Sequence, residues 1–157
     1  MSISVRYANE NDCEVILNFI KELSIYEKLE DQVVATVEDI KETIFDKKHA
    51  EVLLLEADNQ AVGFALFFMN YSTFLGKANI YLEDLFVKET HRNNGYGKML
   101  LQKLATIALE RGCERLDWSC LDWNEKAISF YKQIGAQPLS DWLNFRLNKE
   151  GLKEFIK

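Results

Sequence analysis

The sequence predicts a mixed α/β fold that occupies residues 1–157 as a single domain. Strand-type and helix-type apolar patterns follow one another in the order β-α-α-β-β-β-α-β-α-β, which is typical of a sheet covered by helices. A length of 157 residues suits one domain with a sizeable core of its own. Repeats, low-complexity tracts and linkers are absent, and the share of hydrophobic residues, 48%, is ordinary for a globular protein.

The first third of the chain predicts one strand and two helices. Residues 3–7 alternate apolar and polar side chains, as a short strand does. Asn9 and Asn11 are suited to cap the helix that follows. Its apolar residues recur at helical spacing, at Val15, Ile16, Phe19, Ile20 and Leu23. Thr36 and Asp39 form a capping-box pattern, which predicts a second, shorter helix that ends near Phe45.

The middle of the chain predicts an antiparallel meander. Three apolar runs cover residues 51–57, 61–71 and 80–87. The sequence DNQ, at 58–60, is a tight-turn pattern between the first two runs, and FLGK, at 74–77, supplies the second turn.

The last third predicts two further pairs of helix and strand. A helix over residues 97–110 has a buried apolar face and ends at Gly112. A strand over 116–121 follows, and Asn124 caps a helix over 125–134 that Gly135 ends. A final strand is expected over 143–147, before a short amphipathic tail.

Charge and composition narrow the function classes. The net charge is −6 without a basic stripe, which disfavours nucleic acid as a partner. The longest uncharged apolar run, 61–69, is too short to span a bilayer, and no secretion leader opens the sequence. We therefore expect a cytoplasmic protein without a membrane partner.

The three cysteines, Cys13, Cys113 and Cys120, lack the spacing of metal ligands. Only His49 and His91 could add imidazole ligands, so no metal site is expected. Buried, reduced thiols are the simplest interpretation.

A pair of glycines marks a candidate anion site in the stretch HRNNGYGKML, residues 91–100. Met99 stands where a P-loop needs Ser or Thr, and Leu100 stands where the dinucleotide fingerprint needs its third glycine. The remaining pattern, R-x-x-G-x-G between a strand and a helix, lets free amides of the first helical turn point at an anion. A flexible loop before a glycine-softened helix is the alternative, and the motif by itself is weak.

The neighbouring motifs strengthen the anion-site interpretation. The stretches IYLEDLFV, DWNEKAISFYKQIGA and DWLNFRL resemble, in kind and order, those of the GNAT superfamily of acetyl-CoA-dependent N-acetyltransferases. The resemblance runs from NENDCEVILNFIKELSIYEKLEDQV to FRL and is greatest to the diamine (spermidine/spermine) and thialysine N-acetyltransferases. It implies a mostly antiparallel, twisted central sheet flanked by helices, with acetyl-CoA as co-substrate.

The resemblance also assigns the donor site. The loop from Arg92 to Lys98 resembles the coenzyme A pyrophosphate loop, formed by Arg92, Asn93, Asn94, Gly95, Tyr96, Gly97 and Lys98. Relatives often have glycine where this chain has Asn93, and asparagine tolerates a positive φ better than most residues. The backbone of Leu85, Phe86 and Val87 resembles the strand that pairs with the pantetheine arm. These three residues could also be core alone. Asn124 could contact the cofactor as well as cap its helix.

The same resemblance implies the catalytic groups. Glu83 and Asp84 are adjacent, so in a regular strand only one faces the cleft, and the resemblance points to Glu83. Glu83 could accept the proton of the amine, directly or through water, or it could only bind a cationic substrate. Tyr131 matches the general acid that protonates the departing thiolate, although an amphipathic core tyrosine is the alternative. An acyl-cysteine route through Cys120 is disfavoured, because no histidine is placed to activate the thiol.

The acceptor side and the partners follow from the resemblance too. IYEKLEDQV resembles the segment in which Tyr26 and Glu27 contact a polyamine. Further candidates for the acceptor wall are Asp117, Trp118, Ser119, Asp141 and Trp142. The resemblance implies a homodimer that acetylates a primary amine such as spermidine or an aminoethyl-cysteine-like amino acid. A non-catalytic acyl-CoA-binding regulator and a protein lysine or N-terminal acetyltransferase are the alternative functions.

Overall fold

The computed structural model describes residues 1–157, which form two compact units, Met1–Ser119 and Cys120–Lys157. The first unit contains a five-stranded sheet in the order β1-β2-β3-β4-β5. Its strands are β1 (Ile3–Tyr7), β2 (Glu51–Ala57), β3 (Gln60–Ser72), β4 (Lys77–Val87) and β5 (Leu116–Trp118). Neighbours from β1 to β4 are antiparallel, whereas β4 and β5 are parallel. The predicted mixed α/β class and meander are therefore confirmed.

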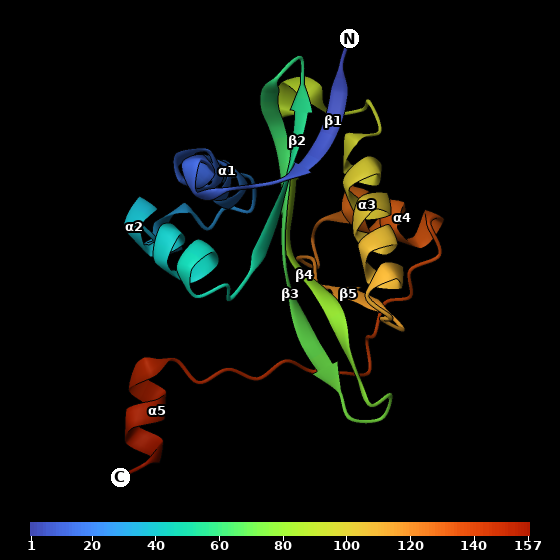
Figure 1. The fold of residues 1–157 in the computed structure, drawn as a ribbon. Helices are drawn as coiled ribbons and strands as arrows, with labels where there is room; N and C mark the ends of the chain where they lie inside the picture. The colour runs from blue at the N-terminus through green and yellow to red at the C-terminus, as the bar shows by residue number, and fades with distance from the viewer. The chain divides into compact units, whose positions relative to one another are not determined.

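Helices cover both faces of this sheet (Figure 1). On one side lie α1 (Cys13–Tyr26) and α2 (Val37–Ile40), and on the other lies α3 (Tyr96–Glu110). Short 3-10 turns at Glu10–Asp12, Glu30–Gln32 and Glu89–His91 connect them, and α2 continues as a π-helical stretch, Lys41–Asp46.

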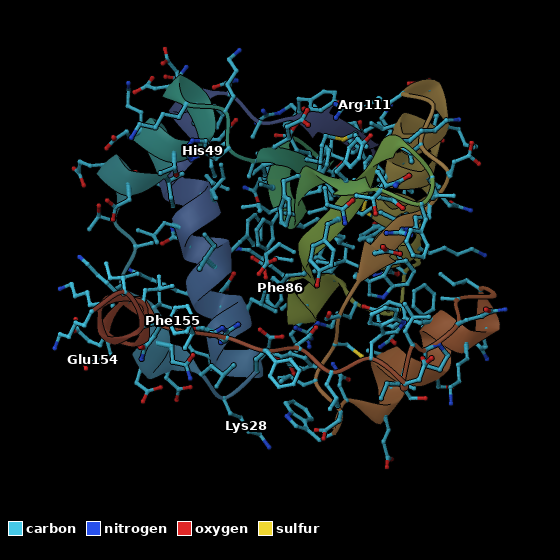
Figure 2. All side chains as sticks on the ribbon, turned by 90° about the horizontal axis from the view of Figure 1, so that it is seen from below. Lys28, His49, Phe86, Arg111, Glu154 and Phe155 are labelled. Atoms are coloured by element: carbon cyan, nitrogen blue, oxygen red, sulfur yellow. The ribbon has the colours of Figure 1, made fainter.

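The core under α1 is aromatic. Phe19 of α1 stacks on Phe64 of β3, with ring centroids 5.2 Å apart, and meets the edge of Phe86 of β4 at 6.2 Å. Figure 2 shows Phe86 on β4, beside α1. It lies near the C-terminal end of α1, just before Lys28. Aromatic rings of this size remove large apolar areas from water, so this cluster fixes α1 against the C-terminal half of β4.

The core under α3 depends on a close approach to the sheet. A Cβ added to Gly63 of β3 would lie 3.0 Å from the Phe86 carbonyl oxygen and 3.6 Å from Leu100 of α3. Leu100 and Leu104, one turn apart on α3, are completely buried. The helix ends as predicted, because Gly112 adopts a positive φ of 75° just after it. Arg111 then forms a two-pronged ion pair with Glu51, with both N–O distances 2.7 Å.

The 3-10 turn Glu10–Asp12 that leads into α1 and the end of α1 are both encoded locally. The side chain of Asn9 accepts a hydrogen bond from the Asn11 amide at 2.9 Å, and the Asp12 carboxylate accepts one from the Asn9 amide at 2.8 Å. Lys28, at φ 61°, ends the helix in a left-handed conformation. Tyr26 and Glu27 therefore lie at the C-terminal end of α1.

The second unit contains α4 (Glu125–Gln133) and α5 (Lys149–Phe155). As predicted, Asn124 caps α4, accepting a hydrogen bond from the Ala127 amide at 3.3 Å, and Gly135 follows at φ 93°. The predicted strand over 143–147 is not formed, and the strand predicted over 116–121 ends at Trp118. Strands need a paired neighbour, which an alternating sequence does not supply by itself.

Two further expectations concerned the burial of the cysteines and the absence of a membrane-spanning segment. Cys13 and Cys113 are buried as expected, but Cys120 is exposed, because it lies beyond the end of β5 rather than in a buried strand. None of the helices has both the length and the apolar character needed to cross a membrane.

Candidate functional site

The central feature of the first unit is a β-bulge in β4 at Glu83. Leu82 is opposite Phe67 of β3, and Asp84 is opposite Leu66, so Glu83 is the extra residue. An inserted residue reverses the in-and-out alternation of the strand beyond it. Asp84 and Phe86 consequently face α1, whereas Leu82 lies on the face that α3 covers. Regular alternation, the premise from which Glu83 and Asp84 were expected to face opposite sides, is therefore interrupted at Glu83.

Beyond the bulge, one edge of β4 is no longer paired with β5. The parallel pairing covers only Ile80–Leu82 of β4 and Leu116–Trp118 of β5. The Lys88 amide donates to the Val62 carbonyl of β3, so by alternation the backbone groups of Leu85 and Val87 point away from β3. The first unit thus presents the main-chain groups of Leu85 and the Val87 amide along an open strand edge. The Val87 carbonyl at the end of this edge accepts a hydrogen bond from Arg92, and the groups of Phe86 point to β3.

The loop between β4 and α3 presents main-chain amides. Asn93 and Gly95 both adopt positive φ, 64° and 76°, and Asn94 braces the turn by donating to the His91 carbonyl at 3.0 Å. The first helical hydrogen bond of α3 runs from the Met99 amide to the Gly95 carbonyl. The amides of Tyr96, Gly97 and Lys98 precede that bond, so they are the donors that a helix start leaves for an anion.

The space above this loop is open to a ligand. A Cβ built on Gly95 or Gly97 would meet no other atom within 4 Å. The two glycines are therefore not required by packing against protein, and the absence of side chains lets an anion approach the amides. The residues fit a phosphate-bearing group at this place.

Three carboxyl groups lie near the bulge. Burial, together with the charges of Glu83 and Glu27, raises the pKa of Asp84 from an ordinary 3.8 to about 7. Burial and the charge of Glu83 also raise the pKa of Glu27. Glu83 itself is exposed. The exposed Glu83 carboxylate thus lies beside Asp84, a carboxyl that exchanges its proton near neutral pH. This combination suits an amine substrate, which must bind as a cation and then lose a proton.

Asp84 was not among the predicted site residues. From the sequence, strand alternation places only one of the two adjacent carboxylates in the site, and the resemblance points to Glu83. The bulge removes the first of these premises. Two adjacent acidic residues inside an apolar strand were nevertheless a signal, because an unpaired charge is rarely left in a core.

Two residues predicted to line the acceptor site, Asp117 on β5 and Ser119 just after it, already have side-chain partners within the first unit. Asp117 forms an ion pair with Arg115, with its Oδ2 atom 2.9 Å from the Arg115 Nε atom, and this pair offsets the charge of the carboxylate. The hydroxyl of Ser119 lies 2.8 Å from that of Tyr81 on β4. Trp118 stands between them in sequence, and its backbone pairs with Leu82.

The remaining predicted residues lie in the second unit. Asn124 caps α4 and Tyr131 lies on that helix, with its ring centroid 5.7 Å from that of Phe130. Asp141 is exposed and Trp142 is 75% exposed. Partial burial of the Cys120 thiol raises its pKa, which reduces its thiolate content and disfavours an acyl-cysteine route.

Comparisons with known proteins agree with this geometry. Residues 16–136 match the model of the acetyltransferase (GNAT) family. A thialysine N-epsilon-acetyltransferase of Sus scrofa is 39% identical over 98% of this chain and 96% of its own. An L-ornithine N5-acetyltransferase of Arabidopsis thaliana is 43% identical over 64% of this chain and 44% of its own.

Solved structures show the same fold. An integron cassette protein from the mobile metagenome of V. cholerae superimposes with a TM-score of 0.84 at 28% identity, over 100% of this chain and 99% of that one.

Proposed function

Because this chain belongs to the acetyltransferase (GNAT) family, we propose specific roles for its residues in moving an acetyl group from acetyl-CoA to a small primary amine. The family match makes the chain an acetyltransferase, and relatives that match it over nearly their full length are named for acetylating thialysine, which supports a small amine as the acceptor. The observation that carries the donor site is the row of free amides at Tyr96, Gly97 and Lys98, next to glycines that no protein atom approaches.

The donor would bind along the open edge of β4 and across the glycine loop. Hydrogen bonds from amides to charged oxygens contribute roughly 1.5–3 kcal/mol each, so three of them outweigh the helix dipole, at roughly 0.3–1 kcal/mol. The main-chain groups of Leu85 and the Val87 amide would bind the pantetheine arm as an added strand does. Asn93, Asn94 and Gly95 shape the loop, and Asn124 is a further candidate contact with the donor.

Glu83 would receive the proton that the amine must lose. A lysine-like amine has a pKa near 10.4, so its deprotonation at pH 7 costs roughly 4.6 kcal/mol. An exposed carboxylate beside the bound amine would offset part of this cost, either by taking the proton directly or through water, or by holding the cation. Asp84, whose pKa is about 7, lies next to Glu83 and would exchange protons with the same site.

Tyr131 would protonate the sulfur of the departing thiolate. A general acid typically contributes about 10²–10⁴-fold to a rate. Tyr131→Phe should therefore keep the affinity for acetyl-CoA and lower turnover by at least about 100-fold. Unchanged turnover at saturating substrates would remove Tyr131 from this role.

The acceptor would be a diamine, a polyamine or a thialysine-like amino acid. The carboxyl groups of Glu27, Glu83 and Asp84 lie close enough to perturb one another, and such a site attracts a cationic chain. Tyr26 precedes Glu27 at the same helix end. Further candidates for the lining of the acceptor site are Trp118, Ser119, Asp141 and Trp142. Asp117 is the weakest candidate, because the ion pair with Arg115 already offsets its charge.

A homodimer is the proposed assembly. In the second unit, Trp142, Leu143 and Phe145 are 75%, 77% and 91% exposed, which is unusual for large apolar side chains close in sequence. A second copy of the chain would cover them. Light scattering should give twice the chain mass, and Phe145→Asp should shift the protein towards monomer. A cytoplasmic location also stays a prediction.

One assay separates the alternatives. Release of CoA from acetyl-CoA is measured with spermidine, putrescine, thialysine, lysine and short peptides as acceptors. We expect turnover with a small amine. Tight acetyl-CoA binding without release would favour a non-catalytic regulator, and turnover with peptides alone would favour a protein acetyltransferase.

A further inference from the structure

Arg92 connects two places that the proposed function assigns to different substrates. It follows the 3-10 turn Glu89–His91 and begins the donor loop, yet its side chain turns back towards the sheet. The Nε–H group donates to the Val87 carbonyl at 2.8 Å. The central carbon of the guanidinium lies 4.9 Å from the Tyr26 ring centroid and 5.2 Å from that of Phe86.

These contacts place Arg92 at the end of the open edge of β4. Val87 points its carbonyl away from β3, so Arg92 occupies an acceptor on the edge along which the donor arm would lie. Leu85 and the Val87 amide remain for that arm. Arg92 therefore contacts the strand end and the end of α1 with one planar group.

The planar guanidinium suits this combination. It donates hydrogen bonds in its own plane and offers its faces to aromatic rings, within the roughly 6 Å at which a cation attracts a ring. A lysine ammonium is a point charge without a plane, and it has no equivalent of the Nε–H group. Lysine at position 92 would keep the charge and lose this geometry.

We propose that Arg92 is a positioning residue that couples the donor loop to Tyr26 in the acceptor site. The proposal rests on the proposed function, because it takes the loop as the donor site and Tyr26 as part of the acceptor site. A donor that orders the loop also orders Arg92, and through the ring contact it fixes Tyr26 for the amine. Coupling between two ligands is reciprocal, so the amine strengthens donor binding by the same factor.

The test measures this factor with two ligands that do not react, CoA and thialysine. Calorimetry gives the Kd of CoA alone and in the presence of saturating thialysine. In the unaltered protein we expect thialysine to tighten CoA binding by at least about fivefold, the lower end of ordinary allosteric coupling. The coupling ratio is the Kd of CoA alone divided by the Kd of CoA with saturating thialysine. In Arg92→Lys this ratio should fall to within about twofold of one, even if the Kd of CoA alone also changes.

Three variants separate coupling from other roles. Tyr26→Leu removes the ring and should abolish the coupling, while Tyr26→Phe keeps the ring and should preserve it. The double variant Arg92→Lys/Tyr26→Leu should show no further loss of coupling beyond either single change. Lys103→Gln removes one exposed positive charge from α3, outside the site, and should leave the ratio unchanged.

Two outcomes overturn the proposal. One is a ratio of one in the unaltered protein. The other is a weaker Kd of CoA in Arg92→Lys with the ratio retained, which would make Arg92 a phosphate ligand only. Failure of the proposed function is distinct from both, because the unaltered protein would then bind no CoA at all, or Gly97→Leu would bind it normally.

Discussion

Replacing Gly97 by leucine should affect stability and donor binding in opposite directions. Gly97 is the second residue of α3 and has an ordinary φ, and a Cβ there would meet nothing within 4 Å. Glycine is about 0.8–1 kcal/mol less favourable than alanine inside a helix, and leucine is close to alanine. The variant should therefore gain up to about 1 kcal/mol, or about 2–4 °C in Tm.

The same side chain would fill the space that an anion needs to reach the amides of Tyr96, Gly97 and Lys98. Loss of a single amide bond to a charged oxygen, at roughly 1.5–3 kcal/mol, raises the Kd of CoA about 10-fold to 150-fold. Loss of more than one bond raises it further.

Calorimetry with CoA and a thermal melt of the same preparations measure both effects. Ala105→Leu, which adds leucine at an exposed position of the same helix, is the matched control and should leave the Kd unchanged. A Tm equal to or above that of the unaltered protein, together with a Kd of CoA within twofold, would refute the placement of the donor at this loop.

Three further predictions concern the fold and the acidic group. Phe64→Ala removes a completely buried ring that stacks on Phe19, and it should lower the free energy of unfolding by about 3–5 kcal/mol in urea titrations; a loss below 1 kcal/mol would contradict this packing. Asn79 is completely buried and accepts hydrogen bonds from the amides of Glu114 and Arg115 at 2.8 and 3.3 Å. Asn79→Ala should therefore lower the free energy of unfolding by about 2–4 kcal/mol. The control is Asn148→Ala, which removes an exposed helix cap and should lower it by at most about 1 kcal/mol. Asp84 has a pKa that folding raises to about 7, so its contribution to stability is full below pH 4 and is lost as the pH rises through 7. Asp84→Asn removes this dependence. The free energy of unfolding of the variant, relative to that of the unaltered protein, should rise by about 3 kcal/mol between pH 5 and pH 8, and a difference that does not change with pH would exclude the raised pKa.

The helices and their ends could be predicted from the sequence because their signals are local. The capping pattern at Asn9, the glycines that follow α3 and α4, and the asparagine cap at Asn124 all lie where the structure uses them. The positive φ of Asn93 was likewise expected from the tolerance of asparagine. Each of these features depends on neighbours within a few residues, so no tertiary information was needed.

Features that depend on a partner far along the chain were not predicted. The strand expected over 143–147 has the right alternation but no neighbour within its unit, and it is not formed. The pairing of β4 with β5 stops at Leu82, and this stop, rather than anything in the LEDLFV sequence, opens the edge of β4.

By itself the sequence determined the family, the glycine-containing loop before α3 and the acidic residues that we propose for the acceptor side. Only the tertiary structure decided which way the strand residues beyond Glu83 face, how far Asp84 is buried, and that Arg92 reaches Tyr26. The physical reason is the bulge. An extra residue in one strand can be recognised only against the register of its neighbour, and it reverses every side chain that follows.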